Sequence, residues 1–238
     1  DKMILNHYLY LLLNISVVSI PLIFSFYHKT EFWSTWKKLL PGLFIMDSIY
    51  ILWDVIFTHL GIWGFNENYL IGFNLINLPL EEWIFFICIP YASLFIHFSM
   101  VKIFPNWKFS RSITRMIYLT IFFGLLILSI VHIGKLYTNF CFIITIILLF
   151  WVSQSRFELL QSFFLSYLFV LLPFFIINGI LTGSFIVDQV VWYNNYHNMG
   201  IRLGTIPFED LFYGLTLLLG TIFISDRYFY KLSVIKIN

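Results

Sequence analysis

Carboxyl groups recur in two similar short segments of this sequence. Residues 78–85 read Leu-Pro-Leu-Glu-Glu-Trp-Ile-Phe, and residues 206–213 read Ile-Pro-Phe-Glu-Asp-Leu-Phe-Tyr. In each segment a proline is followed two residues later by adjacent acids, and these four acids are Glu81, Glu82, Glu209 and Asp210. An apolar setting and a neighbouring acid both favour the protonated form of a carboxyl group, so each pair is a candidate proton donor. The pattern therefore points to general acid–base chemistry.

A polar residue also precedes each segment. Asp54-Val-Ile-Phe-Thr58 aligns with Asn178-Gly-Ile-Leu-Thr182. An ordinary helix start also has a proline followed by acids, because the helix dipole stabilises negative charge there by about 0.3–1 kcal/mol. Two copies, each preceded by a polar residue, favour the functional interpretation. Asp47, two helical turns before Asp54 on the same face, is open between a helix–helix hydrogen bond and a function.

The composition indicates which elements must position these acids. Of 238 residues, 60% are hydrophobic and 11% are charged, whereas a soluble domain has roughly 45–50% and about 25%. Such a chain is also too apolar to be disordered. Its net charge of +2 is too small for a nucleic-acid surface. Cys88 and Cys141 lie far apart in apolar runs, which argues against a disulfide framework or a cysteine metal site. The sequence predicts a polytopic membrane protein.

Seven stretches are apolar and long enough for membrane helices, which take about 20 residues each. They cover roughly residues 8–27, 40–60, 80–100, 116–133, 137–152, 159–181 and 207–225. Because the runs are continuously apolar, helices are favoured over a barrel. Prolines inside four of these runs are tolerated in membrane helices. The predicted fold class is all-α, with about seven transmembrane helices.

The basic residues predict the orientation of these helices. Eleven of the 14 Lys and Arg residues fall in the first, third and fifth loops and the C-terminal tail, where the tail contributes Arg227, Lys231 and Lys236. The exceptions are Lys2, Lys135 and Arg202. Basic loops are cytoplasmic, so we expect the N-terminus outside and the C-terminus in the cytoplasm.

The repeated segments predict two units of three helices in the same orientation, joined by the fourth helix, as in parallel transporter repeats. The expected divisions are residues 1–110, a linking helix within 111–135, and residues 136–238. In this topology Asp54 and all four motif acids lie at one depth, near the outer leaflet. A charged group in the bilayer costs at least ~2.5–3.5 kcal/mol, so such acids usually face a cavity and carry function.

Aromatic residues make up 21% of the chain and several flank the acids. Each ring alone is typical of an interfacial belt, but together they could line a slot whose ring faces stabilise a cation by about 0.5–2 kcal/mol each. The candidate residues for contacting a substrate or cation are Trp53, Trp63, Trp83, Phe85, Asn178, Phe208 and Phe212. The sequence has no Gly-x-Gly-x-x-Gly, Walker, His-Glu-x-x-His or Asp-Asp-x-x-Asp motif, and we predict no cofactor or metal site.

These segments resemble the membrane-integral lycopene cyclase family, in its tandem form of the heterodimeric bacterial carotenoid cyclases. The resemblance rests on Trp53-Asp54, Gly61-Ile-Trp63-Gly-Phe65 and Leu78–Trp83, repeated as Asn178 and Gly204–Asp210. It covers essentially the whole chain. The second copy differs, because Asn178 stands in the place of Asp54 and Asp210 in the place of Glu82, which leaves open whether both copies are catalytic.

The resemblance implies a redox-neutral, proton-initiated cyclisation of the ψ end groups of lycopene to β rings, giving β-carotene by way of γ-carotene. It implies no cofactor, lycopene and membrane lipid as partners, no nucleic acid, and a place in the bacterial cytoplasmic membrane. We expect Glu81 to be the acid, Glu82 or Glu209 the charge partner or base, and Asp54 and Asp210 to support them. A homo-oligomer and association with other carotenoid enzymes are both left open.

Two other functions fit the same acids. The first is a transporter of three, one and three helices that uses them as a proton or solute relay. The second is a membrane-assembly subunit without catalytic activity, in which the acids only cap helices. The deep parts of the third, fourth, fifth and seventh runs are almost entirely aliphatic or aromatic, which favours a lipid-soluble substrate over a transported polar solute.

Overall fold

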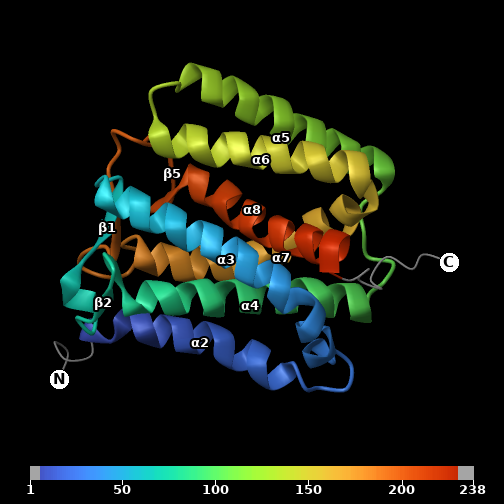
Figure 1. Ribbon diagram of the computed structural model, residues 1–238, viewed down its shortest axis with the longest axis horizontal. Coiled ribbons are helices and arrows are strands. Elements are labelled where there is room, and N and C mark those ends of the chain that lie inside the picture. Colours follow the sequence, from blue (N-terminus) through green and yellow to red (C-terminus); the bar gives the residue numbers. More distant parts are fainter. Residues whose placement is uncertain (1–5, 230–238) are drawn as a thin grey trace.

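Within residues 6–229, the part of the chain that the computed structural model describes, the apolar runs form seven helices lying alongside one another (Figure 1). They are α2 (Leu9–Phe24), α3 (Trp36–His59), α4 (Leu80–Ile103), α5 (Arg111–Val131), α6 (Leu136–Ser155), α7 (Phe157–Leu181) and α8 (Phe208–Ile224). Six are long and apolar enough to cross a membrane, and α2 is a shorter apolar helix of 16 residues. The predicted fold class is confirmed.

The helix ends differ from the prediction most at the starts of α3 and α5, which begin at Trp36 and Arg111 rather than at residues 40 and 116. The first apolar run was expected to continue to residue 27, but α2 stops at Phe24. The chain turns at Ser25, whose hydroxyl donates a 2.6 Å hydrogen bond to the carbonyl of Pro21 and lies 2.5 Å from the Tyr91 hydroxyl. The fifth run, expected to be the shortest, extends over 20 residues as α6.

Prolines are accommodated inside four helices, as expected for membrane helices. They are Pro21 in α2, Pro41 in α3, Pro90 in α4 and Pro173 in α7. Two further prolines, Pro79 and Pro207, stand in extended conformation directly before α4 and α8. Each repeated acidic segment therefore begins a helix, which places its acids in the first helical turn.

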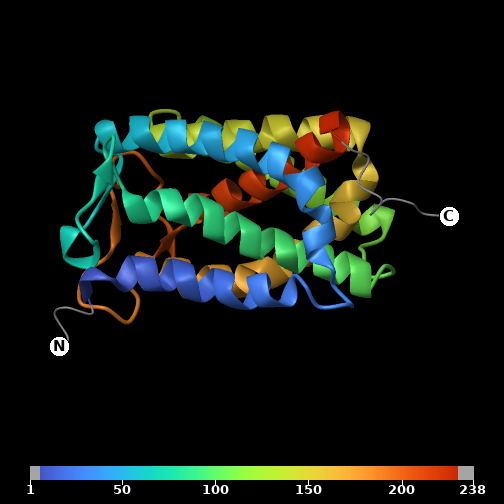
Figure 2. The same cartoon turned by 60° about the horizontal axis from the view of Figure 1, so that its bottom comes forward.

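The two three-helix units, α2–α4 and α6–α8, are interlocked. Within the units, α2 packs along α4 and α6 packs along α8. The second helix of each unit, however, packs more extensively on the third helix of the other unit than on the third helix of its own unit. Helix α3 packs on α8, and α7 packs on α4. Figure 2 shows α3 and α2 on opposite sides of the bundle with α4 between them. The middle of the bundle is therefore formed by helices of both units.

Close contact between α3 and α8 depends on a glycine. A Cβ atom at Gly42 would lie 2.7 Å from the carbonyl oxygen of Thr221 and 3.1 Å from the amide nitrogen of Ser225. Small residues let membrane helices approach this closely, and van der Waals packing then holds them together. The largest buried apolar cluster, which includes Phe98 and Phe163, lies in this half of the bundle.

Short strands gather at the other end of the bundle, where α3 and α7 end and α4 and α8 begin (Figure 1). The strands are β1 (Trp63–Phe65), β2 (Asn74–Leu75), β3 (Leu78–Pro79), β4 (Val191–Tyr193), β5 (Arg202–Leu203) and β6 (Ile206–Pro207). Antiparallel pairing joins β2 to β3 and β5 to β6 within the units, and β1 to β4 between them. Single turns of 3-10 helix cover Phe32–Thr35 and Glu67–Tyr69, and a π-helical turn covers Ser225–Phe229.

The basic residues used to orient the chain lie in loops or in the terminal turns of helices, at the two ends of this bundle. Lys135 and Arg202 are at the strand end, close to Asn195, which both contact. Lys2, Lys231 and Lys236 lie outside the described residues. The predicted divisions fall at Ser110 and Lys135, which immediately precede α5 and α6; the domain boundaries themselves stay a prediction.

Candidate active site

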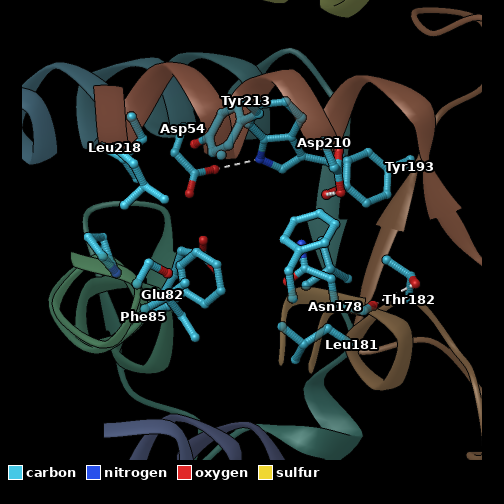
Figure 3. Close-up of a pocket in the computed structure, with 18 of the residues that line it drawn as sticks. Asp54, Glu82, Phe85, Asn178, Leu181, Thr182, Tyr193, Asp210, Tyr213 and Leu218 are labelled. Carbon is cyan, nitrogen blue, oxygen red and sulfur yellow. Dashed lines mark hydrogen bonds between the residues drawn. The ribbon is translucent and has the colours of Figure 1, made fainter. Parts of the chain in front are cut away.

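An internal cavity lies between α3, α4, α7 and α8 near the strand end of the bundle (Figure 3). The space between its lining residues, counted together with the open space that adjoins it, is about 870 Å³. Three of the five predicted carboxylates line it, namely Asp54, Glu82 and Asp210. Much of the remaining wall is apolar, from Phe85, Ile89, Pro90, Val170, Phe174, Leu181, Leu217 and Leu218. An apolar cavity with a few convergent polar groups is the usual form of a small-molecule site.

Glu82 is held in place by the first helix. Its Oε2 atom accepts a 2.5 Å hydrogen bond from the hydroxyl of Tyr10 on α2. One turn later on α2, the amide of Asn14 donates a 2.8 Å hydrogen bond to the carbonyl of Glu81. These two bonds tie α2 to the first turn of α4. The side chain of Glu82 is thereby directed at the cavity rather than at lipid (Figure 3).

Asp54 accepts its hydrogen bonds from residues close in sequence. Its Oδ1 atom lies 2.5 Å from the indole nitrogen of Trp63, which donates, and 3.1 Å from the donating hydroxyl of Thr58. Thr58 is one turn further along α3, and Trp63 begins β1 after the helix has ended. Asp54 and Glu82 lie on the same side of the cavity (Figure 3).

Asp210 lies on the other side of the cavity and accepts hydrogen bonds on both carboxyl oxygens (Figure 3). Tyr137 on α6 donates to Oδ1 at 2.5 Å, and Tyr193 in β4 donates to Oδ2 at 3.0 Å. Burial and the negative charge of Asp210 raise the pKa of Tyr193, so its hydroxyl remains a donor. The Arg202 guanidinium lies 5.5 Å from the centroid of the Tyr193 ring.

The other two motif acids are buried but do not line the cavity. Glu81 accepts the backbone N–H of Ile71 at 2.6 Å. Glu209 accepts the backbone N–H of Met199 at 2.8 Å and the hydroxyl of Thr138 at 2.5 Å. Among the described residues, one oxygen of each acid, Oε2, has no hydrogen-bond partner. Glu81 therefore holds the loop at Ile71 against the first turn of α4, and Glu209 holds the loop at Met199 against the first turn of α8.

The two units build their halves of the site in the same way. Tyr10 and Tyr137 occupy corresponding positions in the first helix of each unit, and each donates to the second acid of its motif, Glu82 or Asp210. The difference lies at the end of the second helix, because Asn178 lines the cavity where the first unit supplies a carboxylate. The cavity is therefore symmetric in construction and unequal in chemistry.

The predicted aromatic residues divide into two groups. Trp63 and Phe85 line the cavity, together with Tyr213, which had flanked the second motif. Trp53 lies behind Tyr213, with ring centroids 4.9 Å apart. Trp83 donates to the carbonyl of Leu75 at 3.3 Å, outside the cavity. Phe208 and Phe212 pack against Phe142, with ring centroids at 6.4 and 5.4 Å, and also lie outside it.

Metal-binding side chains do not gather within residues 6–229, where no group of three His, Cys, Asp or Glu residues could hold an ion. Cys88 and Cys141 are buried free thiols. The thiol of Cys141 donates to the carbonyl of Glu209 at 3.3 Å, which is a packing role corresponding to that of Asn14 in the first unit.

Comparison with protein families explains why the two halves match. The family model described as lycopene cyclase matches residues 7–100 and 134–228. The chain belongs to the lycopene cyclase family. The matched segments contain both three-helix units of this cyclase and leave α5 between them. Neither a curated protein nor a solved structure matches the cyclase.

Membership of the family gives the cavity a general function. The cyclase is an enzyme of the carotenoid cyclase type, and its substrate is a carotenoid. The six long apolar helices and the family together indicate a membrane protein. An apolar cavity surrounded by membrane helices suits a hydrocarbon substrate, because the substrate can leave the bilayer for the site without crossing water.

The tyrosines of the cyclase were the residues that the sequence analysis missed. Tyr10 donates to Glu82, and Tyr137 and Tyr193 donate to Asp210. Tyr10 and Tyr137 are more than 70 residues from the acid that each contacts, and Tyr193 is 17 residues from Asp210. A signal for two of them was present. Aligning the first and fifth apolar runs places Tyr10 opposite Tyr137, in the same way that the acidic segments align.

Proposed function

We propose that this cyclase converts the ψ end groups of lycopene to β rings, giving γ-carotene and then β-carotene. A proton adds to C2 of the terminal C1=C2 double bond. The C5=C6 double bond then closes on C1, which leaves a cation at C5. Loss of the proton on C6 forms the new C5=C6 double bond. One proton enters and one leaves, so the reaction is redox-neutral.

The observation that carries this proposal is the meeting of Asp54, Glu82 and Asp210 around one apolar cavity. We assign the general acid to Glu82, with Asp54 as its charge partner. Tyr10 occupies Oε2 of Glu82 as a donor, which leaves Oε1 to carry the proton. Two neighbouring carboxyl groups disfavour ionisation of both, so one of them tends to retain its proton. Glu81 is the less suitable acid, because its bound oxygen serves the backbone of Ile71.

The aromatic wall supports the cationic part of this reaction. Trp63, Phe85 and Tyr213 line the same cavity as the acids. Ring faces stabilise a nearby cation, and a dry wall keeps water from capturing the cation as an alcohol. We include Asn178 among the substrate contacts because it also lines the cavity, and we assign Trp53, Trp83, Phe208 and Phe212 to supporting the wall from behind.

We also propose an orientation and location. Lys37 and Lys38 in the first turn of α3, Arg115 near the start of α5 and Arg156 between α6 and α7 all lie at the end of the bundle away from the strands. Since basic loops are cytoplasmic, the cavity lies toward the outer face of a bacterial cytoplasmic membrane, with the N-terminus outside and the C-terminus inside. Membrane lipid is then both the surroundings and the route by which lycopene arrives.

Expression in a bacterium that accumulates lycopene tests the proposal. The expected result is loss of lycopene with formation of pigments that carry β rings, detected by chromatography and mass. In deuterated water one deuterium should appear at C2 of each new ring. Unchanged lycopene, with the protein present in the membrane, would overturn the cyclase assignment and favour the transporter or the assembly subunit. Unlabelled rings would overturn initiation by a proton.

A further inference from the structure

The two sides of the cavity are unequal in a way that bears on the last step of cyclisation. Asp54 and Glu82 form a cavity acid pair on one side, and the corresponding positions on the other side hold Asn178 and Asp210 (Figure 3). Two neighbouring acids can hold a proton between them. An acid whose corresponding neighbour is an amide has no such partner.

The hydrogen bonds of Asp210 distinguish it further from the cavity acid pair. Both of its oxygens accept, one from Tyr137 at 2.5 Å and one from Tyr193 at 3.0 Å. An ionised carboxylate is an acceptor at both oxygens, whereas a protonated one must donate at one of them. Hydrogen bonds to an ionised acceptor are also the stronger kind. This arrangement, which we call the tyrosine clamp (Tyr137 and Tyr193), fits an ionised Asp210.

The clamp also fixes where the carboxylate points. The two donors come from separate elements, α6 and β4, and they hold both oxygens at once. Rotation of the carboxyl group would break at least one of these bonds. Arg202 stacks at 5.5 Å from the ring of Tyr193 and donates to the carbonyl of Thr205, which anchors that side of the clamp.

Resting on the proposed function, we propose that Asp210 is the base that removes the final proton, and that Tyr137 and Tyr193 are positioning residues that determine which ring forms. The C5 cation can lose a proton from C6, from C4 or from the methyl group on C5. These losses give a β ring, an ε ring with a C4=C5 double bond, or a ring with an exocyclic double bond. The base that lies nearest one of these hydrogens selects the product.

The protons and electrons balance in this scheme. Glu82 gives its proton to C2, and the C6–H bond breaks with its electron pair entering the C5=C6 double bond. The released proton goes to Asp210. Return of that proton to the cavity acid pair, by exchange within the cavity, restores the enzyme for the next end group. No oxidant or reductant takes part.

The test compares three tyrosine-to-phenylalanine variants in the lycopene-accumulating host: Tyr137→Phe, Tyr193→Phe and, as the matched control, Tyr10→Phe. Each removes one hydroxyl that donates to a cavity carboxylate. Loss of a hydrogen bond to a charged group lets the carboxylate move. Both clamp variants should raise the share of ε or exocyclic rings by roughly tenfold, whereas Tyr10→Phe should slow conversion without changing that share.

The distribution of ring types decides the outcome, because a purely structural defect lowers the amount of product without redirecting it. An unchanged distribution in both clamp variants, with cyclic product still formed, would overturn the inference. A shift of the same size in Tyr10→Phe would also overturn it, since the effect would then not belong to Asp210. Absence of any cyclic product from the unaltered protein would instead contradict the proposed function itself.

Discussion

The indole N–H of Trp63 donates a 2.5 Å hydrogen bond to Oδ1 of Asp54. Trp63 lies in β1, which pairs with β4 of the second unit, and Asp54 lies in α3, which packs on α8 of the second unit. The bond therefore couples the position of a cavity carboxylate to the joint between the two units.

Removing this donor should lower activity more than stability. In Trp63→Phe an aromatic ring remains, but the indole N–H and part of the ring volume are lost; loss of the hydrogen bond alone costs about 1.5–3 kcal/mol for a charged acceptor. We expect conversion of lycopene to fall by roughly tenfold or more, measured as initial rate in membranes. Trp107→Phe, which alters a half-exposed ring in the loop before α5, should be indistinguishable from the unaltered protein. Equal activity of both variants would contradict a role for Trp63.

The two adjacent acids of the first motif should behave differently. Glu82→Gln removes the proposed acid, and since general acids contribute roughly 10²–10⁴-fold, conversion should fall by at least about 100-fold. Glu81→Gln keeps an oxygen that can accept from Ile71, so its loss should stay within about tenfold. Both variants should be assayed at equal membrane content. The opposite ranking would return the acid role to Glu81.

The contact at Gly42 should be sensitive to any side chain. Gly42→Val would place atoms within 2.7 Å of the backbone of α8, and such overpacking costs about 1–3 kcal/mol. We expect a lower unfolding temperature in detergent and reduced conversion, because α3 and α8 carry Asp54 and Asp210. Gly124→Val on α5, where a Cβ meets no atom within 4 Å, is the control. Equal unfolding temperatures for Gly42→Val and Gly124→Val would show that α8 can shift to make room for the new side chain.

Filling the cavity should block the reaction without unfolding the protein. Gly214 lines the cavity one turn after Asp210 on α8. A Cβ there would lie 3.3 Å from the hydroxyl of Tyr167, so Gly214→Leu must direct its larger side chain into the empty space. Conversion should fall by about tenfold or more while the unfolding temperature changes little. Full activity of Gly214→Leu would mean that the substrate does not use this part of the cavity.

The sequence was sufficient to predict the helices and the end of the bundle at which the acids meet. Long apolar runs leave few alternatives to membrane helices, and Pro79 and Pro207 mark where two of them start. Because consecutive membrane helices are joined at one membrane face, the end of α3 and the start of α4 must lie at the same face. The gathering of Asp54, Glu82 and Asp210 follows from this topology.

What the sequence did not determine was the direction of each side chain. Adjacent residues on a helix point about 100° apart, so Glu81 and Glu82 cannot both face the cavity. Which of them does depends on the packing of α2 against α4, and that contact is fixed by Tyr10 and Asn14, about 70 residues earlier in the chain. The pairing of β1 with β4 was missed for a similar reason, because Gly64 and its partner Trp192 are 128 residues apart.

The exchange of partners between α3, α4, α7 and α8 means that neither unit encloses the reaction chamber alone. Two identical units, paired about a twofold axis, would have built the same chamber with a carboxylate at all four positions. Because the two units of this protein are encoded as separate segments of one chain, a residue in one unit can be substituted while the corresponding residue in the other unit stays the same. With Asn178 at the position that corresponds to Asp54, the two sides of the chamber differ in chemistry, and this difference is what the proposed separation of the acid, Glu82, from the base, Asp210, requires.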